Sequence, residues 1–153
     1  MNPAFHDSKT GWKLYQHPLF RDQLNALVAE AEVLARRLSA NDYSHHPKVR
    51  LLARVRKIIL EDIPRDPGSP TFEQGNTLGS SYRHWRRAKF NQRFRIFFRF
   101  HTASQVIIYA WMNDESTLRA RGSRRDVYAT FERRLKAGEP PDDWDDLFAE
   151  SRP

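Results

Sequence analysis

The stretch RRAKFNQRFRIFFRF, residues 86–100, interleaves basic and apolar side chains around a polar pair, Asn91-Gln92. It contains six Arg or Lys residues and no Asp or Glu. Successive side chains of a β-strand point to opposite faces of the sheet. From residue 93 on, one face would carry only apolar side chains: Phe94, Ile96, Phe98 and Phe100. The opposite face would carry three arginines and one aromatic ring: Arg93, Arg95, Arg99 and Phe97.

Two further strands are predicted beside this one. Strands over 82–90, 93–101 and 105–113 would be joined by short polar turns, which favours an antiparallel meander. In the strand over 82–90, alternation places Trp85, Arg87 and Lys89 on one side and Ala88 and Phe90 on the other. We therefore expect the basic rows of neighbouring strands to share one face of the sheet.

Helices are predicted before and after these strands. Residues 17–39 and 47–63 carry apolar side chains at helical spacing, and Pro64 is expected to end the second helix. The sequence SRRD (123–126) is typical of a capping box that opens a helix ending at Gly138, and an acid-rich tail follows. The order predicts one α+β domain over 1–153, with a basic antiparallel sheet (82–113) flanked by N-terminal helices and a C-terminal helix with the tail (123–153). The basic face is expected to be open.

Charge is distributed unevenly along the chain. The 153 residues carry a formal net charge of +7, and 20 of the 26 basic residues are arginine. No Asp or Glu lies between Glu73 and Asp114, and this segment alone has a net charge of +7. Such a segment favours a polyanionic partner, although the acidic residues of 139–150 could instead neutralise it. The tail would then act as a regulatory cover, or simply as a solvated terminus.

Composition excludes several classes of protein. The absence of cysteine excludes disulfides, thiol nucleophiles and cysteine-ligated zinc, and agrees with a cytoplasmic location. The longest apolar run, 106–112, is too short to cross a bilayer, and the first residues lack the apolar run of a signal peptide. The sequence indicates no cofactor and no membrane partner.

Phosphate is the anion that an arginine-rich strand face suits best. Four aromatic residues near the basic positions are expected to stack on unpaired bases, which favours single-stranded RNA: Trp85, Phe97, Tyr109 and Trp111. Asn113 and Arg119, at the edge of the basic face, could bind a base or a phosphate, although the favoured interpretation is that Asn113 or Asp114 ends the strand and caps a short helical turn. A basic face that only binds solvent is the alternative to RNA binding.

If the chain cleaves RNA, its sequence favours a reaction without metal. The basic segment has no carboxylates that could hold two metal ions, so attack by the neighbouring 2′-hydroxyl remains. That reaction needs a base, an acid and a group that stabilises charge on the phosphate. Arginine can stabilise charge but cannot act as the base. Lys89 is the candidate for proton transfer, because neighbouring positive charges favour its neutral form, and three residues are substitutes: His84, His101 and Tyr128.

Several motifs resemble those of the YhaV toxin family, within the RelE/ParE-like superfamily of type II toxin-antitoxin modules. They are GWKLYQHP (11–18), HWRRAKF (84–90), RFRIFFRF (93–100), VIIYAWMNDESTLR (106–119) and LKAGEPPDDW (135–144). The resemblance implies a RelE-like α+β fold and an RNA-cleaving toxin that stops translation. It also implies a PrlF-like antitoxin of the AbrB type, a swapped-hairpin DNA-binding protein. It makes Arg87 the leading catalytic position and Trp144 a residue needed for activity, unless Trp144 only anchors the tail.

The resulting hypothesis is a metal-independent endoribonuclease toxin that cleaves mRNA, free or on the ribosome. Arg87 would stabilise the transition state and Lys89 would assist proton transfer. Arg93, Arg95 and Arg99 would bind the RNA backbone. Two alternatives remain at this point: a toxin that poisons a protein such as DNA gyrase, and a single-stranded RNA-binding module without chemistry.

Overall fold

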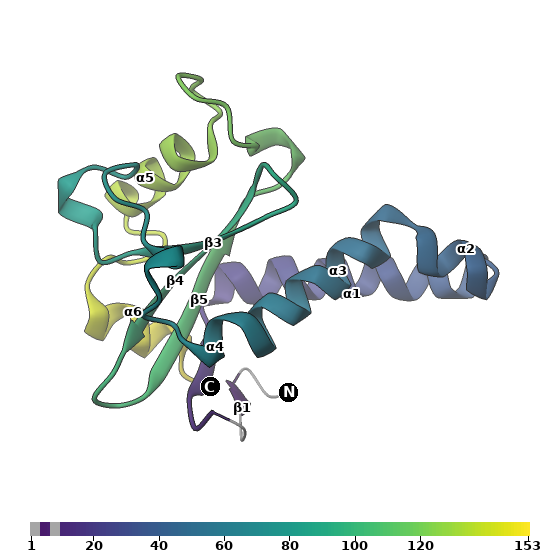
Figure 1. Ribbon diagram of the computed structural model, residues 1–153, viewed down its shortest axis with the longest axis horizontal. Helices are drawn as coiled ribbons and strands as arrows, with labels where there is room; N and C mark the ends of the chain where they lie inside the picture. Colours follow the sequence, from purple (N-terminus) through teal and green to yellow (C-terminus); the bar gives the residue numbers. More distant parts are fainter. Residues whose placement is uncertain (1–3, 7–9) are drawn as a thin grey trace.

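A mixed five-stranded sheet forms the centre of the protein, which we describe from a computed structural model covering residues 4–6 and 10–153 (Figure 1). The strand order is β1-β2-β5-β4-β3. The strands are β1 (Ala4–His6), β2 (Lys13–Gln16), β3 (Arg86–Phe90), β4 (Phe94–His101) and β5 (Val106–Met112). The predicted α+β class and the antiparallel meander β3-β4-β5 are confirmed. The sheet as a whole is mixed, because β2, which precedes the predicted strands, pairs parallel with β5.

Strand β2 has no counterpart in the sequence prediction. Its four residues are too few to reveal an alternating pattern, and its partner strand begins only at Val106. Leu14 lies opposite Ile107 and Tyr15 lies opposite Ile108. Leu14 is fully buried, so this short strand carries core packing as well as hydrogen bonds.

A bulge in β5 changes which side chains reach each face. Phe97 of β4 pairs with Trp111, whereas the next residue, Phe98, pairs with Tyr109, so Ala110 has no residue opposite. Tyr109 therefore packs in the cluster on one face of the sheet, and Trp111 packs in the cluster on the other. Both rings are buried.

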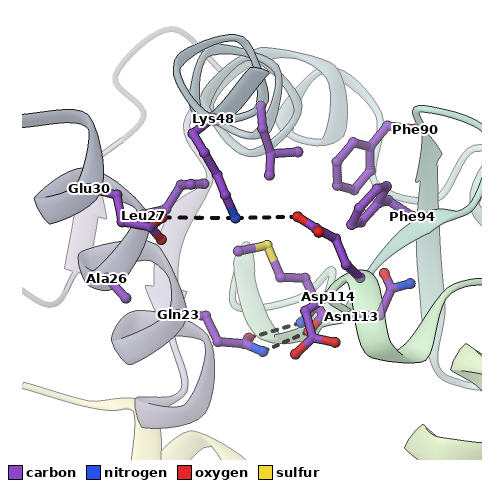
Figure 2. A pocket seen from close by; sticks show the side chains of 12 residues that line it. Gln23, Ala26, Leu27, Glu30, Lys48, Phe90, Phe94, Asn113 and Asp114 are labelled. Atoms are coloured by element: carbon purple, nitrogen blue, oxygen red, sulfur yellow. Dashed lines mark hydrogen bonds and ion pairs between the residues drawn. The ribbon is translucent and has the colours of Figure 1, made fainter. Parts of the chain in front are cut away.

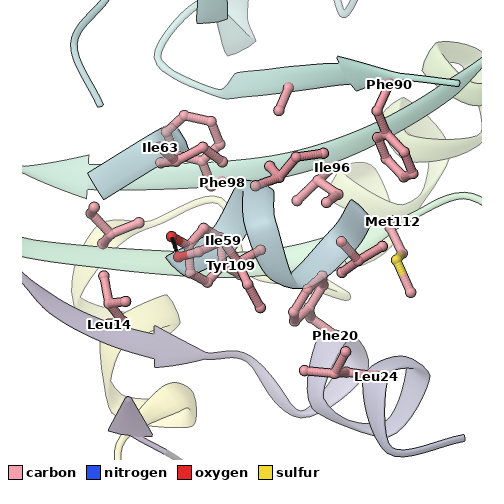
Figure 3. Packing of buried hydrophobic residues seen from close by; sticks show 14 of the residues in the cluster. Leu14, Phe20, Leu24, Ile59, Ile63, Phe90, Ile96, Phe98, Tyr109 and Met112 are labelled. Carbon is pink, nitrogen blue, oxygen red and sulfur yellow. Dashed lines mark hydrogen bonds between the residues drawn. The ribbon is translucent and has the colours of Figure 1, made fainter. Parts of the chain in front are cut away.

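The first face of the sheet is covered by α1 (Pro18–Arg37) and α3 (Pro47–Lys57), as predicted for 17–39 and 47–63. Figure 3 shows Phe20 and Leu24 of α1 against β4 and β5 side chains. The second helix continues through a π-helical turn (Ile58–Asp62) into α4 (Ile63–Arg65). Tyr109 Oη donates to the carbonyl of Ile59 in this turn at 2.6 Å. With α2 (Ala40–His45), the helices α1 and α3 form a hairpin that extends away from the sheet (Figure 1).

The second face of the sheet is also covered, and the expectation of an open basic face is wrong. Helices α5 (Val127–Ala137) and α6 (Trp144–Ser151) pack there. The ring of Phe131 stacks on Phe97 at 4.1 Å and on Trp111 at 5.4 Å between centroids. The predicted alternation in this strand is confirmed, because Phe97 packs on one face of the sheet and its neighbours Ile96 and Phe98 pack on the other. No helix in the described part of the chain is long and apolar enough to cross a membrane.

Candidate active site

Three residues from three elements meet on the face that α5 covers. Arg87 of β3 donates from Nε to Tyr128 Oη at 2.9 Å, and Arg95 of β4 donates from Nε to the same oxygen at 3.0 Å. All three side chains are buried, with exposed fractions of 7%, 6% and 3% for Arg87, Arg95 and Tyr128. Because both guanidinium groups donate to the phenol oxygen, the hydroxyl proton of Tyr128 must point away from both of them. We call these residues the Arg87–Arg95–Tyr128 cluster.

Neutral acceptors satisfy the two arginines. Arg87 donates from Nη1 to the carbonyl of Thr71 at 3.0 Å, and Arg95 donates from Nη1 to the carbonyls of Gln92 and Phe94, both at 2.9 Å. Within the described residues, no carboxylate lies within ion-pair distance of either arginine. Two positive charges thus share one buried oxygen without an opposing charge. Such a site attracts an anion, because charge interactions strengthen away from water.

The position of Tyr128 is fixed by the start of α5. Asp126 is the N-cap, and its Oδ2 accepts from the N–H of Tyr128 at 3.0 Å. Its Oδ1 accepts from the N–H of Ala120 at 2.6 Å and from Arg119 Nη1 at 2.8 Å. Burial alone would raise the pKa of Asp126, but these hydrogen bonds and the charge of Arg119 hold that pKa below its usual range. The helix therefore opens at Asp126, and the expectation that Ser123 opens it is corrected.

An open hollow of about 410 Å³ adjoins Tyr128. The basic loop 119–126 and the first turns of α5 line most of it, and Thr77 lies on the other side. Arg119, Arg124 and Arg133 contribute positive charge to its wall, and Asp126 and Glu132 contribute negative charge, so the wall carries a net positive charge. The guanidinium carbon of Arg119 lies 4.8 Å from the centre of the Tyr128 ring. The volume falls in the range of sites that bind small ligands.

Lys89 and Arg93 lie near the cluster and are exposed. Lys89 pairs with Arg95 across the β3–β4 ladder, and strand alternation directs it to the same face as Arg87. Arg93 donates from Nε to the carbonyl of Arg119 at 3.0 Å, which ties the β3–β4 turn to the basic loop. These contacts bring together four predicted residues: Arg87, Arg93, Arg95 and Arg119. Lys89 lies beside Arg95 in the ladder and lines a separate hollow with Arg54 and Asp62.

A second group of predicted residues gathers around Asp142, in the segment before α6. Arg99 Nη1 donates to the carbonyl of Asp142 at 2.7 Å, and Trp85 Nε1 donates to Asp142 Oδ1 at 2.8 Å. His84 Nε2 lies 2.6 Å from the same carboxylate oxygen. The guanidinium of Arg99 lies between two rings, 5.4 Å from Trp85 and 5.5 Å from Trp144. Burial lowers the pKa of Arg99, opposed by the charges of Asp142 and Asp143.

The expected stacking of aromatic residues on bases is corrected. Trp85, Phe97 and Tyr109 are fully buried and Trp111 is 4% exposed, so their faces are already covered by other side chains. Asn113 is buried as well, and its side-chain amide is used in hydrogen bonds within the protein. Its Oδ1 accepts from the N–H of Arg95 at 2.8 Å, and its Nδ2 donates to the carbonyls of Arg93 and Thr117. Asn113 holds β4 to the chain that follows β5.

Residues 14–152 match the model of a family described as a toxin with endonuclease activity, of a toxin-antitoxin system. The chain belongs to the YhaV toxin family. It is 44% identical over 149 residues to Ribonuclease toxin YhaV of Escherichia coli strain K12, with 96% of each chain covered. Identity and coverage are the same for Toxin YhaV of Escherichia coli O6:H1 strain CFT073. No solved structure matches the chain significantly.

The two positions that the YhaV resemblance singles out lie in different groups. Arg87 belongs to the Arg87–Arg95–Tyr128 cluster. Trp144, the first residue of α6, contacts Arg99 and stacks on His101 at 5.5 Å and on Phe148 at 6.3 Å between centroids. Tyr128, one of three substitutes for proton transfer in the sequence analysis, makes the closest contact with Arg87. Its place among the apolar helix positions Val127, Phe131 and Leu135 is the signal that its hydroxyl is buried and needs a partner.

Proposed function

We propose that this chain is a metal-independent endoribonuclease toxin that cleaves mRNA in the cytoplasm and so inhibits translation. The observation that carries the proposal is the convergence of Arg87 and Arg95 on Tyr128 Oη without an opposing carboxylate. Membership in the YhaV family supports the same conclusion, because that family is described as toxins with endonuclease activity. A relative is named a ribonuclease toxin, which supports RNA as the substrate.

The reaction follows from the groups in the cluster. The 2′-hydroxyl of a nucleotide attacks the adjacent phosphorus, so that a bond to O2′ forms and the bond to the 5′-oxygen of the next nucleotide breaks. Arg87 and Arg95 stabilise the negative charge that builds on the phosphate oxygens. Tyr128 directs its proton away from both arginines and gives it to the departing 5′-oxygen. Lys89, which lies opposite Arg95 in the β3–β4 ladder, is the group assigned to accept the proton of the 2′-hydroxyl. The products are a 2′,3′-cyclic phosphate and a free 5′-hydroxyl.

Binding of the RNA chain is assigned to the hollow beside Tyr128. Arg119 and Arg124 line it, and exposed Arg93 lies next to the same loop, so three cations surround the path of a phosphate backbone. Arg99 has a different role from the one expected, since its contacts with Asp142 and Trp144 hold the C-terminal segment against the sheet. The position of Trp144 in this contact gives it an indirect part in activity.

The antitoxin that a toxin-antitoxin system implies is proposed to be PrlF-like, with an AbrB-type swapped hairpin. This proposal for the type of antitoxin rests on the family resemblance alone. The substrate is proposed to be mRNA, free or bound to the ribosome.

The test is cleavage of an end-labelled mRNA by the purified protein in EDTA, with and without ribosomes. We expect products with 5′-hydroxyl ends from the wild type and from Arg50→Ala, a control at an exposed position of α3. We expect Arg87→Ala to cleave the mRNA far more slowly than the wild type, at a residual rate that only single-turnover conditions reveal. Cleavage that requires an added divalent metal would overturn the proposal, as would full activity of a folded Arg87→Ala variant.

A further inference from the structure

A groove of about 270 Å³ lies between the helical hairpin and the tip of the β3–β4 hairpin (Figure 2). Side chains from α1 and α3 line one side of the groove, and Phe90 and Phe94 line the opposite side down to its floor. The end of β5 and the turn that follows it close the remaining side. The groove is separate from the hollow beside Tyr128, with which it shares no lining residue. It takes no part in the chemistry proposed above.

The floor of the groove is apolar and reaches solvent. The rings of Phe90 and Phe94 lie 5.5 Å apart between centroids, and Leu27 and Met112 face them across the groove. Phe94 and Leu51 are only half-buried. The volume suits one large aliphatic or aromatic side chain, which would remove the exposed parts of Phe94 and Leu51 from water.

The rim of the groove is acidic, in contrast to the net charge of +7 of the whole chain. Lys48 lies between Glu30 and Glu115, with its Nζ 3.9 Å from Glu30 and 3.4 Å from Glu115, and Asp114 also lines the groove (Figure 2). Hydrogen bonds from Ser116 lower the pKa of Asp114, which keeps this carboxylate charged at neutral pH. Both contacts of Lys48 are long and exposed, so another cation can replace it at small cost.

The charge of the rim decides between the two kinds of macromolecule that a toxin of this family meets. RNA carries a negative charge on each nucleotide, so three carboxylates at the rim repel it. A protein segment with Lys or Arg beside an apolar residue suits both the rim and the floor. Asn113, at the inner end of the groove, also holds the N–H of Arg95. An occupant of the groove therefore lies one residue away from the Arg87–Arg95–Tyr128 cluster.

We infer that this groove binds a segment of the cognate antitoxin in which a large apolar side chain is flanked by Lys or Arg. The apolar side chain packs between Phe90, Phe94 and Leu27. The neighbouring cation binds between Glu30 and Glu115, where Lys48 now lies. This inference rests on the proposed function, because it takes the partner of the toxin to be an antitoxin.

The test uses Ala26→Trp, which fills the groove from an exposed position of α1 that lines it. Ala29→Trp is the matched control, since Ala29 is exposed on the same helix and does not line the groove. We expect Ala26→Trp to weaken binding of the purified cognate antitoxin, measured by calorimetry, about tenfold or more. We expect Ala29→Trp to bind like the wild type and both variants to keep the RNA-cleaving activity of the wild type.

A second pair tests the rim. Glu115→Lys should weaken antitoxin binding, whereas Glu32→Lys, a charge reversal at an exposed position of α1 outside the groove, should not. Equal antitoxin affinity of Ala26→Trp and Ala29→Trp would overturn the inference. It would also be overturned if Ala26→Trp weakened binding of RNA but not of the antitoxin. A wild type that binds antitoxin but cleaves no RNA would contradict the proposed function, and the antitoxin affinities of the variants would still test the groove.

Discussion

Replacing Tyr128 by Phe removes one oxygen atom and leaves two buried guanidinium groups without their shared acceptor. The ring itself is kept, with its edge-to-face contact to Phe97 at 5.7 Å between centroids. A buried donor that loses its acceptor costs about 1–3 kcal/mol. Arg87 keeps the carbonyl of Thr71 and Arg95 keeps two carbonyls, which limits the combined loss. We expect Tyr128→Phe to lower the free energy of unfolding by about 2–4 kcal/mol.

The assay is urea unfolding followed by tryptophan fluorescence and circular dichroism. With a urea dependence of about 2 kcal/mol per molar, in the middle of the typical range, the midpoint should fall by about 1–2 M. Tyr15→Phe is the control, because within the described structure the hydroxyl of this half-buried tyrosine makes no hydrogen bond while its ring packs on Phe148. A loss for Tyr128→Phe no larger than that for Tyr15→Phe would refute the reasoning that both arginines depend on this oxygen.

Three further predictions concern pH, salt and the C-terminal segment. The folded state holds the pKa of Asp126 below its unfolded value, so the stability that this carboxylate contributes is present above about pH 4 and is lost as the pH falls further. Asp126→Asn should therefore flatten the acid part of a curve of stability against pH. An unchanged slope would contradict this role of Asp126. RNA binding should weaken with salt, and Arg124→Ala should reduce the slope of log affinity against log salt concentration by about 0.7. Arg36→Ala, at an exposed position of α1, should leave this slope unchanged. Equal slopes for the two variants would show that RNA does not bind in the hollow. Trp144→Ala should increase hydrogen exchange in α6 and around Arg99, because the ring contacts that hold this segment are lost. Unchanged exchange would show that Trp144 does not anchor the segment.

The parts of the fold that depend on local patterns were predictable from the sequence. Strands β3 and β4 follow from alternation, β5 follows from its apolar run and the short turn before it, and α1 and α3 follow from helical spacing. Strand β2 depends on a partner at Val106 and has no local pattern of its own. The choice of Asp126 over Ser123 as the N-cap was not predictable either, because both residue types cap helices and lie three positions apart.

The site was predicted only in part, for a physical reason. An arginine row on a strand suggests an open face, because a guanidinium group is costly to bury. Here carbonyl groups of Thr71 and Gln92 and the hydroxyl of Tyr128 satisfy the buried arginines, and these acceptors come from distant parts of the chain. Sequence patterns can propose Arg87 and Arg95 as candidates, but the contact that unites them is set by the tertiary fold.

The central claim is that Arg87 and Tyr128 act as one unit in metal-free RNA cleavage. The most direct measurement is the single-turnover rate of mRNA cleavage in EDTA for the wild type, Arg87→Ala, Tyr128→Phe and the double variant, each confirmed as folded. Residues that act as a unit have strongly non-additive effects. We therefore predict that the double variant cleaves no more slowly than the slower single variant. Losses in the two single variants that multiply in the double variant would contradict the claim.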